Sequence, residues 1–322
     1  MRSPVLVIAN PVSGRGRGAR LARAFTERLR TIGCAVDLRE TRRAGDALRH
    51  ASAAPAFAAV VCVGGDGTAN EIINGLPPGG AAPPLAMVPC GTANVLAKEL
   101  ALPSDPVRLA DLVASGPEVA WDLGVDRRSG RRFALFAGAG FDAQVVHDFH
   151  AARTGPIRMA EYVLWGLQGL LHYRPPRLRL ALDGRRLEEE VSWALVANVS
   201  GYGGPLAFTP RARPDDGLFE VMVIRRRPRR DLVRIFGAAH LGHLLGIDLL
   251  AGIASFHRAR RVSVEAADGG PVPVQIDGDP GGLLPADLEL LPLALRLLVP
   301  PGGARLRTSA RTGASSCAGS SG

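Results

Sequence analysis

Short apolar runs alternate with amphipathic runs as far as about residue 120 of the chain. The apolar runs predict buried strands at 5–9, 34–41, 56–63 and 84–89. Helical spacing follows these runs at 19–33, at 44–54, directly after the glycines at 64–67, within 90–102 and at 105–116. Strands that alternate with helices in this way indicate a parallel, doubly wound sheet. We therefore expect residues 1–124 to form an α/β domain.

The pattern changes after residue 124 to mostly β-type runs. Two strands are expected to pair around a polar turn at 127–130, and a hairpin is expected to turn at Asp183-Gly184. Further β-type runs lie at 216–224, 261–266 and 272–277, with one helical run at 157–173. The sequence thus predicts a mainly antiparallel β domain over 125–300. Its last apolar run, 288–299, could return to either domain.

Two segments need a separate interpretation. The run 236–256 is long and apolar enough to resemble a membrane span, but it carries His240, His243 and Asp248. Because such residues are costly within a bilayer, we expect a buried or interfacial helix instead. Residues 301–322 are rich in Gly, Ser, Ala and Thr, which predicts a disordered tail.

The formal net charge of the 322-residue chain is +9, and Lys98 is the only lysine among its basic residues. Arginine side chains bind phosphates and phospholipid headgroups well. A basic surface therefore favours nucleic acid, anionic membrane or nucleotide partners without choosing between them. A compositional bias of the coding genome explains the arginines equally well.

The cysteines of the sequence show no metal-binding or disulfide pattern. Cys34, Cys62, Cys90 and Cys317 form no CxxC pair, and three of them sit beside apolar runs. This indicates buried thiols in a reducing cytosol.

Three loops that follow predicted strands are rich in small residues: NPVSG at 10–14, GGDGT at 64–68 and CGTAN at 90–94. In an open parallel sheet, ligands bind at the carboxyl ends of the strands, where all three loops are expected to lie. Main-chain N–H groups in such turns, together with helix N-termini, form a cradle for anions. The chain has neither a Walker-type GxxxxGK[ST] nor a well-spaced GxGxxG. The loops therefore favour a phosphate site other than those of Walker-type NTPases or dinucleotide oxidoreductases.

In order and spacing, NPVSG, GGDGTANEIINGL and PLAMVPCGTANVLAKEL resemble the diacylglycerol kinase catalytic-domain family, which includes soluble bacterial lipid kinases and sphingosine and ceramide kinases. Two later segments, GGPLAFTPRARPDDGLFEVMVI and VQIDGD, resemble the DDG and DGE segments of this family. The resemblance covers nearly all of 5–300. It implies a nucleotide-binding α/β domain, a C-terminal β-sandwich domain and an active site in the cleft between them.

The resemblance also implies transfer of the γ-phosphate of ATP to a lipid hydroxyl, with Mg²⁺ as cofactor. It assigns ATP contacts to Asn10, Pro11, Val12, Ser13, Gly14, Thr41, Gly64, Gly65, Asp66, Gly67, Thr68, Ala69, Asn70, Glu71, Gly91, Thr92 and Asn94. Asp216 matches the acidic ligand of a structural magnesium site, which the carbonyls of Arg213 and Leu218 would complete. Asp279 and Asp66 are the two candidate bases for the attacking hydroxyl.

The sequence departs from the family pattern at two positions. Asp279 stands where most members have a glutamate, and Val95 stands where bacterial diacylglycerol kinases have an aspartate of a magnesium network. An apolar residue at position 95 is more similar to sphingosine kinases, in which an acid at the position of Asp142 lies near the lipid headgroup. A simple loop or helix cap explains Asp142 equally well.

Four functions follow from these observations. We expect an ATP-dependent kinase for diacylglycerol or a related lipid alcohol; the alternatives are a long-chain-base kinase of the sphingosine type, an NAD kinase-like enzyme for a soluble substrate, and a lipid-binding module with weak catalysis. The expected partners are the lipid alcohol and an anionic membrane surface, without nucleic acid, and a homodimer is left open. We expect a cytoplasmic protein that associates peripherally with the membrane.

Overall fold

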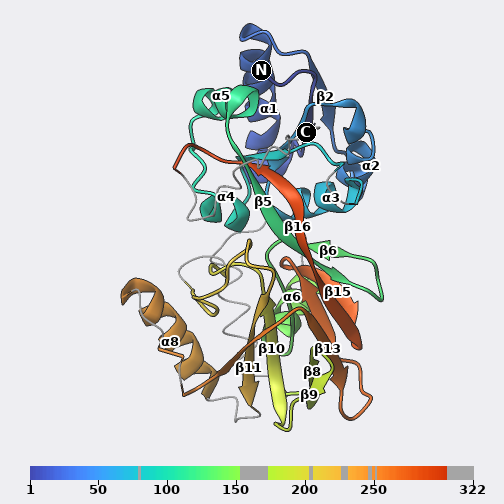
Figure 1. Cartoon of the computed structure of the whole chain (residues 1–322), viewed down its shortest axis with the longest axis vertical. Helices are drawn as coiled ribbons and strands as arrows, with labels where there is room; N and C mark the ends of the chain where they lie inside the picture. Colours follow the sequence, from blue (N-terminus) through green and yellow to red (C-terminus); the bar gives the residue numbers. More distant parts are fainter. Residues whose placement is uncertain are drawn as a thin grey trace, which may run out of the picture.

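The computed structural model describes residues 1–78, 81–152, 173–202, 206–225, 231–245, 249–250 and 252–302. The chain forms an upper and a lower body joined by two long strands (Figure 1). The helix expected at 157–173 (apart from Tyr173), the arginine-rich run at 226–230, the tail beyond residue 302 and Cys317 all lie outside the described residues.

The first body is built on a parallel sheet, as the sequence predicts. Its strands are β1 (Val5–Ala9), β2 (Val36–Glu40), β3 (Ala59–Gly64) and β4 (Leu85–Pro89), in the order β2-β1-β3-β4. The helices of this body are α1 (Ser13–Thr31), α2 (Asp46–Ala51), α3 (Asp66–Gly75), α4 (Val95–Glu99) and α5 (Pro106–Ser115). All four strands run in one direction, so their carboxyl ends meet at one edge of the sheet.

Alternate side chains of these strands enter two different cores. On β1, Leu6 and Ile8 belong to the core that also contains residues of α2 and α3. Val5 and Val7 belong to the core that contains residues of α1 and α5. Successive side chains of a strand point to opposite faces, so the sheet has helices on both sides.

The second body is mainly antiparallel. Its shorter elements are β6 (Arg132–Phe133), β7 (Phe136–Ala139), α6 (Phe141–Ala152), β8 (Leu178–Leu182), β9 (Arg185–Arg186), β10 (Val191–Ala197), β11 (Phe219–Arg225), α8 (Asp231–Leu245), β12 (Ser255–Ala259), β13 (Arg261–Ala266), β14 (Pro273–Ile276) and β15 (Asp279–Leu283). The predicted turns are confirmed, because β5 (Glu118–Asp126) pairs with β6 and β8 pairs with β9 across Asp183-Gly184. A third apolar core lies in this body.

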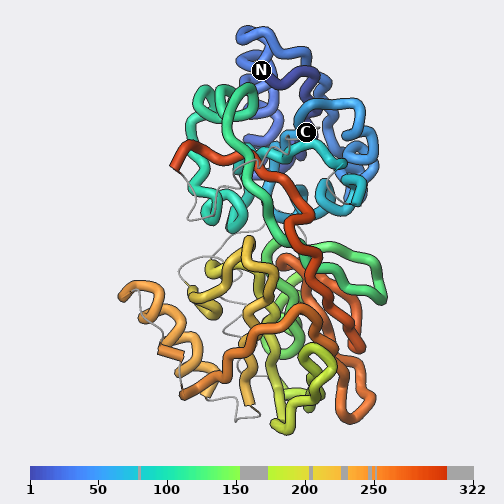
Figure 2. The backbone as a smooth tube through the Cα atoms, in the orientation of Figure 1, coloured from blue at the N-terminus to red at the C-terminus, as the bar shows by residue number. Residues whose placement is uncertain are grey.

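Two long strands, β5 (Glu118–Asp126) and β16 (Ala286–Leu298), connect the bodies as an antiparallel ribbon (Figure 2). The C-terminal end of β16 pairs in parallel with β4 of the first body, through Leu297 and Leu85. The N-terminal end of β16 pairs with β13 of the second body. The last apolar run of the chain therefore belongs to both domains, an outcome that the sequence left open.

Two helices differ from the sequence prediction. The strands expected up to Phe141 are present as β5, β6 and β7, but α6, which begins at Phe141 after the left-handed φ of Gly140, was not predicted. The apolar run at 236–256 does contain helix, but α8 begins at Asp231 and ends at Leu245, before β12. Among the described residues, no helix is both long enough and apolar enough to cross a membrane.

Candidate active site at the domain boundary

The three glycine-rich loops meet at the carboxyl edge of the parallel sheet. The amide of Asn10 lies 3.4 Å from Thr68 Oγ1, which joins the first loop to the second. A Cβ on Gly91 would lie 2.5 Å from the Cα of Gly65, which is closer than atoms can approach. The second and third loops therefore need glycine because their backbones touch.

The second loop leads directly into a helix. Gly65 is the extended residue before α3, and Asp66, Gly67 and Thr68 form the first turn of that helix. The first N–H groups of a helix have no partner within it, so this turn presents donors and the positive end of the helix dipole. The arrangement can bind a phosphate at this edge of the sheet.

The side chain of Asp66 ties the second loop to the third. Its Oδ2 accepts a hydrogen bond from the main-chain N–H of Val95 at 3.0 Å, and its Oδ1 accepts one from Leu96 at 3.1 Å. Burial raises the pKa of this carboxyl, while the two main-chain donors oppose the shift. Asp66 thus caps the start of α4 from a neighbouring loop.

A carboxylate of the second domain stands beside the second loop. Asp279 is the first residue of β15, and a Cβ placed on Gly67 would lie 3.4 Å from its Oδ2. The guanidinium of Arg131 lies 3.6 Å from the same oxygen, and Nε2 of His150 lies 3.3 Å from Oδ1. The side chain is 38% exposed, so a substrate can reach it. The phosphate loop of one domain and a carboxylate of the other therefore face each other.

A buried aspartate two residues earlier fixes this geometry. Asp277 accepts main-chain hydrogen bonds from Ala134, Leu135 and Phe136 at 2.9, 2.9 and 3.0 Å, and Asn70 Nδ2 donates to its Oδ2 at 2.8 Å. Burial raises the pKa of Asp277 to about 6, against the effect of these donors. Because Asn70 belongs to α3, the bond holds the phosphate-loop helix against the turn that carries Asp279.

Asp142 lies in a buried polar cluster of the second domain. Gln275 Nε2 and the hydroxyl of Tyr202 donate to its Oδ2 at 3.0 and 3.1 Å. Burial raises the pKa of Asp142 to about 6. The ring of Tyr202 stacks on Phe136, and that of Phe141 packs edge-on against Tyr173. One oxygen of the buried Asp142 carboxyl group, Oδ2, thus has two side-chain donors, and the other, Oδ1, is buried without a hydrogen-bond partner among the described residues.

Comparison with known proteins assigns this architecture to a family. Residues 4–125 match the diacylglycerol kinase catalytic domain, and residues 136–299 match the YegS C-terminal NAD kinase beta sandwich-like domain. A diacylglycerol kinase of Mycobacterium tuberculosis (strain CDC 1551 / Oshkosh) is 33% identical over 309 residues, which cover 93% of this chain and 96% of that protein. The chain belongs to the diacylglycerol kinase family. It is a lipid kinase.

Other relatives of this lipid kinase agree with that assignment. A diacylglycerol kinase of Bacillus subtilis (strain 168) is 27% identical over 297 residues, covering 91% of this chain and 95% of the relative. The crystal structure of a diacylglycerol kinase from Bacillus anthracis str. Sterne superposes with a TM-score of 0.72 at 21% identity, covering 94% of this chain and 99% of that one. This structural likeness confirms the two-domain fold, with a parallel sheet in the first domain and a β-sandwich in the second.

Several residues expected at the ATP site of this lipid kinase have structural contacts of their own. The buried Thr41 donates its main-chain N–H to the carbonyl of Ala9, and a carboxylate oxygen of Glu71 accepts the N–H of Ala47 at 3.2 Å. The amide of Asn94 closes the third loop on Gly91. These contacts shape the loops, and the assigned ATP contacts stay predictions.

The acidic residue of the magnesium site expected at Arg213, Asp216 and Leu218 is paired with another side chain in this structure. The Asp216 carboxylate forms a close ion pair with Arg258 and accepts the N–H of Leu218. A guanidinium therefore already neutralises the carboxylate that was expected to bind the cation. Among the described residues, no group of three His, Cys, Asp or Glu side chains is arranged to hold a metal ion. The magnesium site expected at Asp216 stays a prediction.

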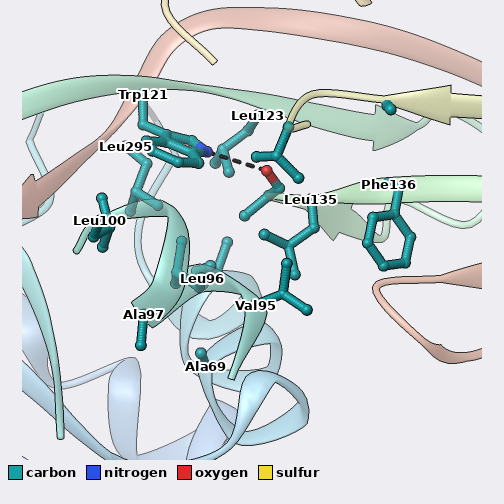
Figure 3. Packing of buried hydrophobic residues seen from close by; sticks show 14 of the residues in the cluster. Ala69, Val95, Leu96, Ala97, Leu100, Trp121, Leu123, Leu135, Phe136 and Leu295 are labelled. Atoms are coloured by element: carbon teal, nitrogen blue, oxygen red, sulfur yellow. Dashed lines mark hydrogen bonds between the residues drawn. The ribbon is translucent and has the colours of Figure 1, made fainter. Parts of the chain in front are cut away.

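Val95, the second departure from the family pattern, is a core residue here. Its side chain is 5% exposed and lies in the cluster with Ala69, Leu96 and Leu135 (Figure 3). Leu135 comes from the second domain, and Trp121 Nε1 donates to the neighbouring carbonyl of Ala134 at 3.1 Å. An apolar contact between the domains thus occupies the position where the family pattern led us to expect a carboxylate.

Three residues of the site were missed in the sequence: Asp277, Arg131 and His150. Asp277 ends a buried strand and precedes a glycine, so its position next to Asp279 in VQIDGD was a usable signal. Arg131 and His150 gave no such signal, because the first is one of four arginines within 127–132 and the second lies in an unpredicted helix.

Proposed function

We propose that this lipid kinase transfers the γ-phosphate of ATP to the hydroxyl of diacylglycerol or a related lipid alcohol. The observation that supports the proposal most directly is the position of Asp279 opposite Gly67 of the phosphate loop. Phosphoryl transfer depends mainly on positioning and charge stabilisation, and an alcohol nucleophile needs a base within reach.

In this proposal, the triphosphate of ATP lies on the main-chain N–H groups of the three loops. Support comes from the close approach of Gly65 and Gly91 and from the first turn of α3, which leave no room for side chains beside the backbone. Asp66 holds the third loop in register through its bonds to Val95 and Leu96. The carboxylate of Asp66 contributes to catalysis by holding the loops that bind the triphosphate in place.

Asp279 accepts the proton of the lipid hydroxyl as the oxygen attacks the γ-phosphorus. Arg131, whose guanidinium also donates to the carbonyl of Pro280 at 2.7 Å, keeps this carboxylate oriented and places a positive charge near the transferred phosphate. Magnesium bound with ATP would neutralise the charge on the phosphate oxygens. Because Asp216 is paired with Arg258 in this structure, no step is assigned to it.

We further propose that the protein reaches its lipid at an anionic membrane surface. The helix α8 lies at the edge of the second domain (Figure 1), and its side chains of Val233, Leu241, Leu244 and Leu245 are exposed. Exposed apolar groups on a helix, together with the charge of +9, favour contact with anionic bilayers.

Labelled phosphate from γ-labelled ATP tests the proposal. The purified protein is given mixed vesicles that contain diacylglycerol, with sphingosine and NAD as separate acceptors, and the products are separated by thin-layer chromatography. We expect label in phosphatidic acid, and Asp279→Asn to reduce kcat by about 10²-fold or more while the affinity for ATP changes little. Label in sphingosine or NAD alone would contradict the proposed acceptor, and no label in any acceptor would leave a lipid-binding module.

A further inference from the structure

The imidazole of His150 joins the proposed base to the rest of helix α6. Its Nδ1 lies 2.9 Å from the carbonyl oxygen of Val146, one turn earlier. Its Nε2 lies 3.3 Å from Oδ1 of Asp279. The ring therefore bridges the main chain and the carboxylate that faces the phosphate loop.

The contact with Val146 determines which nitrogen carries hydrogen. A carbonyl oxygen only accepts hydrogen bonds, so Nδ1 must be the donor. In neutral imidazole the other nitrogen, Nε2, is then an acceptor, and its lone pair faces Asp279. The contact between Nε2 and Oδ1 becomes a hydrogen bond only when one further proton lies between the two residues.

We propose that His150 is the group to which Asp279 passes the proton of the lipid hydroxyl, an inference that rests on the proposed kinase reaction. Before transfer, His150 is neutral and Asp279 is ionised. As the hydroxyl oxygen forms its bond to the γ-phosphorus, the bond from that phosphorus to the bridging oxygen of ADP breaks. The hydroxyl proton moves through Asp279 to Nε2, and nothing is oxidised or reduced.

The product state of this step is an imidazolium beside a carboxylate. That pair has the extra proton that the geometry requires, and its opposite charges attract across 3.3 Å. The side chain of His150 is 22% exposed, so the proton can then leave to water. Asp279 is thereby returned to its ionised form for the next turnover.

The charged groups around the pair are consistent with this role. The guanidinium of Arg131 approaches the other carboxylate oxygen of Asp279, Oδ2, at 3.6 Å and places a positive charge beside it. The carboxylate of Asp277, in the turn before β15, accepts hydrogen bonds from main-chain N–H groups and from Asn70. On α6 itself, Asp148 accepts from Gln144. His147 contacts the carbonyl of Val274 at 2.9 Å.

The experiment compares His150→Gln with wild type and with His147→Gln. Glutamine can still donate a hydrogen bond to Asp279 but does not titrate. His147 serves as the matched control because it lies on the same helix and contacts a main-chain carbonyl of β14. For each protein, kcat for lipid phosphorylation and the affinity for an ATP analogue are measured across the pH range of imidazole titration.

We expect His150→Gln to lower kcat by about 10-fold or more at unchanged ATP-analogue affinity, and to remove an acid limb that wild type and His147→Gln both show. Loss of kcat with the acid limb intact, or wild-type kcat in His150→Gln, would overturn the proton-acceptor role. If wild type itself phosphorylates no lipid, the kinase proposal has failed and not this one. Unchanged thermal unfolding of the variant excludes a folding defect as the cause.

Discussion

Asn70 donates a hydrogen bond to Asp277 at 2.8 Å across 207 residues of sequence, and both side chains are buried. The bond fastens the helix that begins at the phosphate loop to the turn before β15. The second glycine-rich loop and Asp279, the proposed base, belong to different domains, and this contact helps to fix the distance between them. The geometry proposed for catalysis therefore depends on a polar contact that takes no part in the reaction.

Asp277→Asn should destabilise the protein. Main-chain N–H groups donate to the carboxylate of Asp277 in the wild type. The NH₂ group of asparagine cannot accept these hydrogen bonds, and a buried donor left without an acceptor costs roughly 2–3 kcal/mol. Urea unfolding followed by circular dichroism measures the loss. Asp268→Asn is the control, because Asp268 is 63% exposed in an ion pair with Arg177. Equal stability of the two variants would show that the Asp277 contacts contribute little.

Asp66→Ala should abolish phosphoryl transfer and leave a folded protein. The substitution removes the acceptor for Val95 and Leu96, which loosens the third loop and costs roughly 1 kcal/mol of stability, as for a helix cap. Asp105→Ala removes a comparable cap from α5, where Asp105 accepts from Val107. We expect the same loss of stability in this control with full kinase activity. Activity near the wild-type level in Asp66→Ala would exclude Asp66 from the mechanism.

Gly91→Ala should weaken ATP binding and stability together. Its Cβ would lie 2.5 Å from the Cα of Gly65, so the two loops must separate, at a cost of about 1–3 kcal/mol. In Gly237→Ala the new Cβ meets no atom within 4 Å, and alanine within α8 should stabilise by roughly 0.5–1 kcal/mol. Calorimetric titration with an ATP analogue and thermal unfolding check both variants. Tight ATP binding in Gly91→Ala would show that the loops do not form the cradle.

Asp142 should make the unfolding free energy depend on pH in a defined direction. In the folded protein its pKa is raised to about 6, whereas an unfolded aspartate titrates near 3.9. The folded state therefore holds the proton more tightly, and the stability that this provides at low pH is lost as the pH rises through about 6. Urea unfolding at several pH values is compared between wild type and Asp142→Asn.

The difference in unfolding free energy between wild type and Asp142→Asn should fall by up to about 3 kcal/mol between roughly pH 4 and pH 7, at 1.36 kcal/mol per pKa unit. Taking the difference between the two proteins cancels the titration of Asp277, which is present in both. A difference that is independent of pH would mean that Asp142 has the same proton affinity in the folded and unfolded chain.

Local sequence patterns predicted the loops of the site but not the contacts between them. Glycines after apolar runs located Gly65 and Gly91, because turn chemistry and strand ends are local properties. The bonds from Val95 and Leu96 to Asp66 join residues about 30 positions apart and depend on how the strands are ordered. No local pattern encodes that order.

The same limit explains the residues around Asp279. The resemblance of VQIDGD to a family segment identified the carboxylate, but His150 reaches it from α6, a helix that was not predicted from the sequence. Arg131 directly follows the predicted polar turn at 127–130 and was not singled out. Its function becomes visible only when β14 and β15 lie beside that turn, which is a tertiary relationship.

The pairing of β16 with β4 also affects how the protein can be made. A ribosome releases the nucleotide-binding half first, yet that half lacks its neighbour for β4 until Leu297 has been synthesised. Domains usually fold as units during synthesis, beginning with the N-terminal one. Here the sheet of the first body stays incomplete until β16 has left the ribosome. Both bodies should therefore complete their folding at almost the same time.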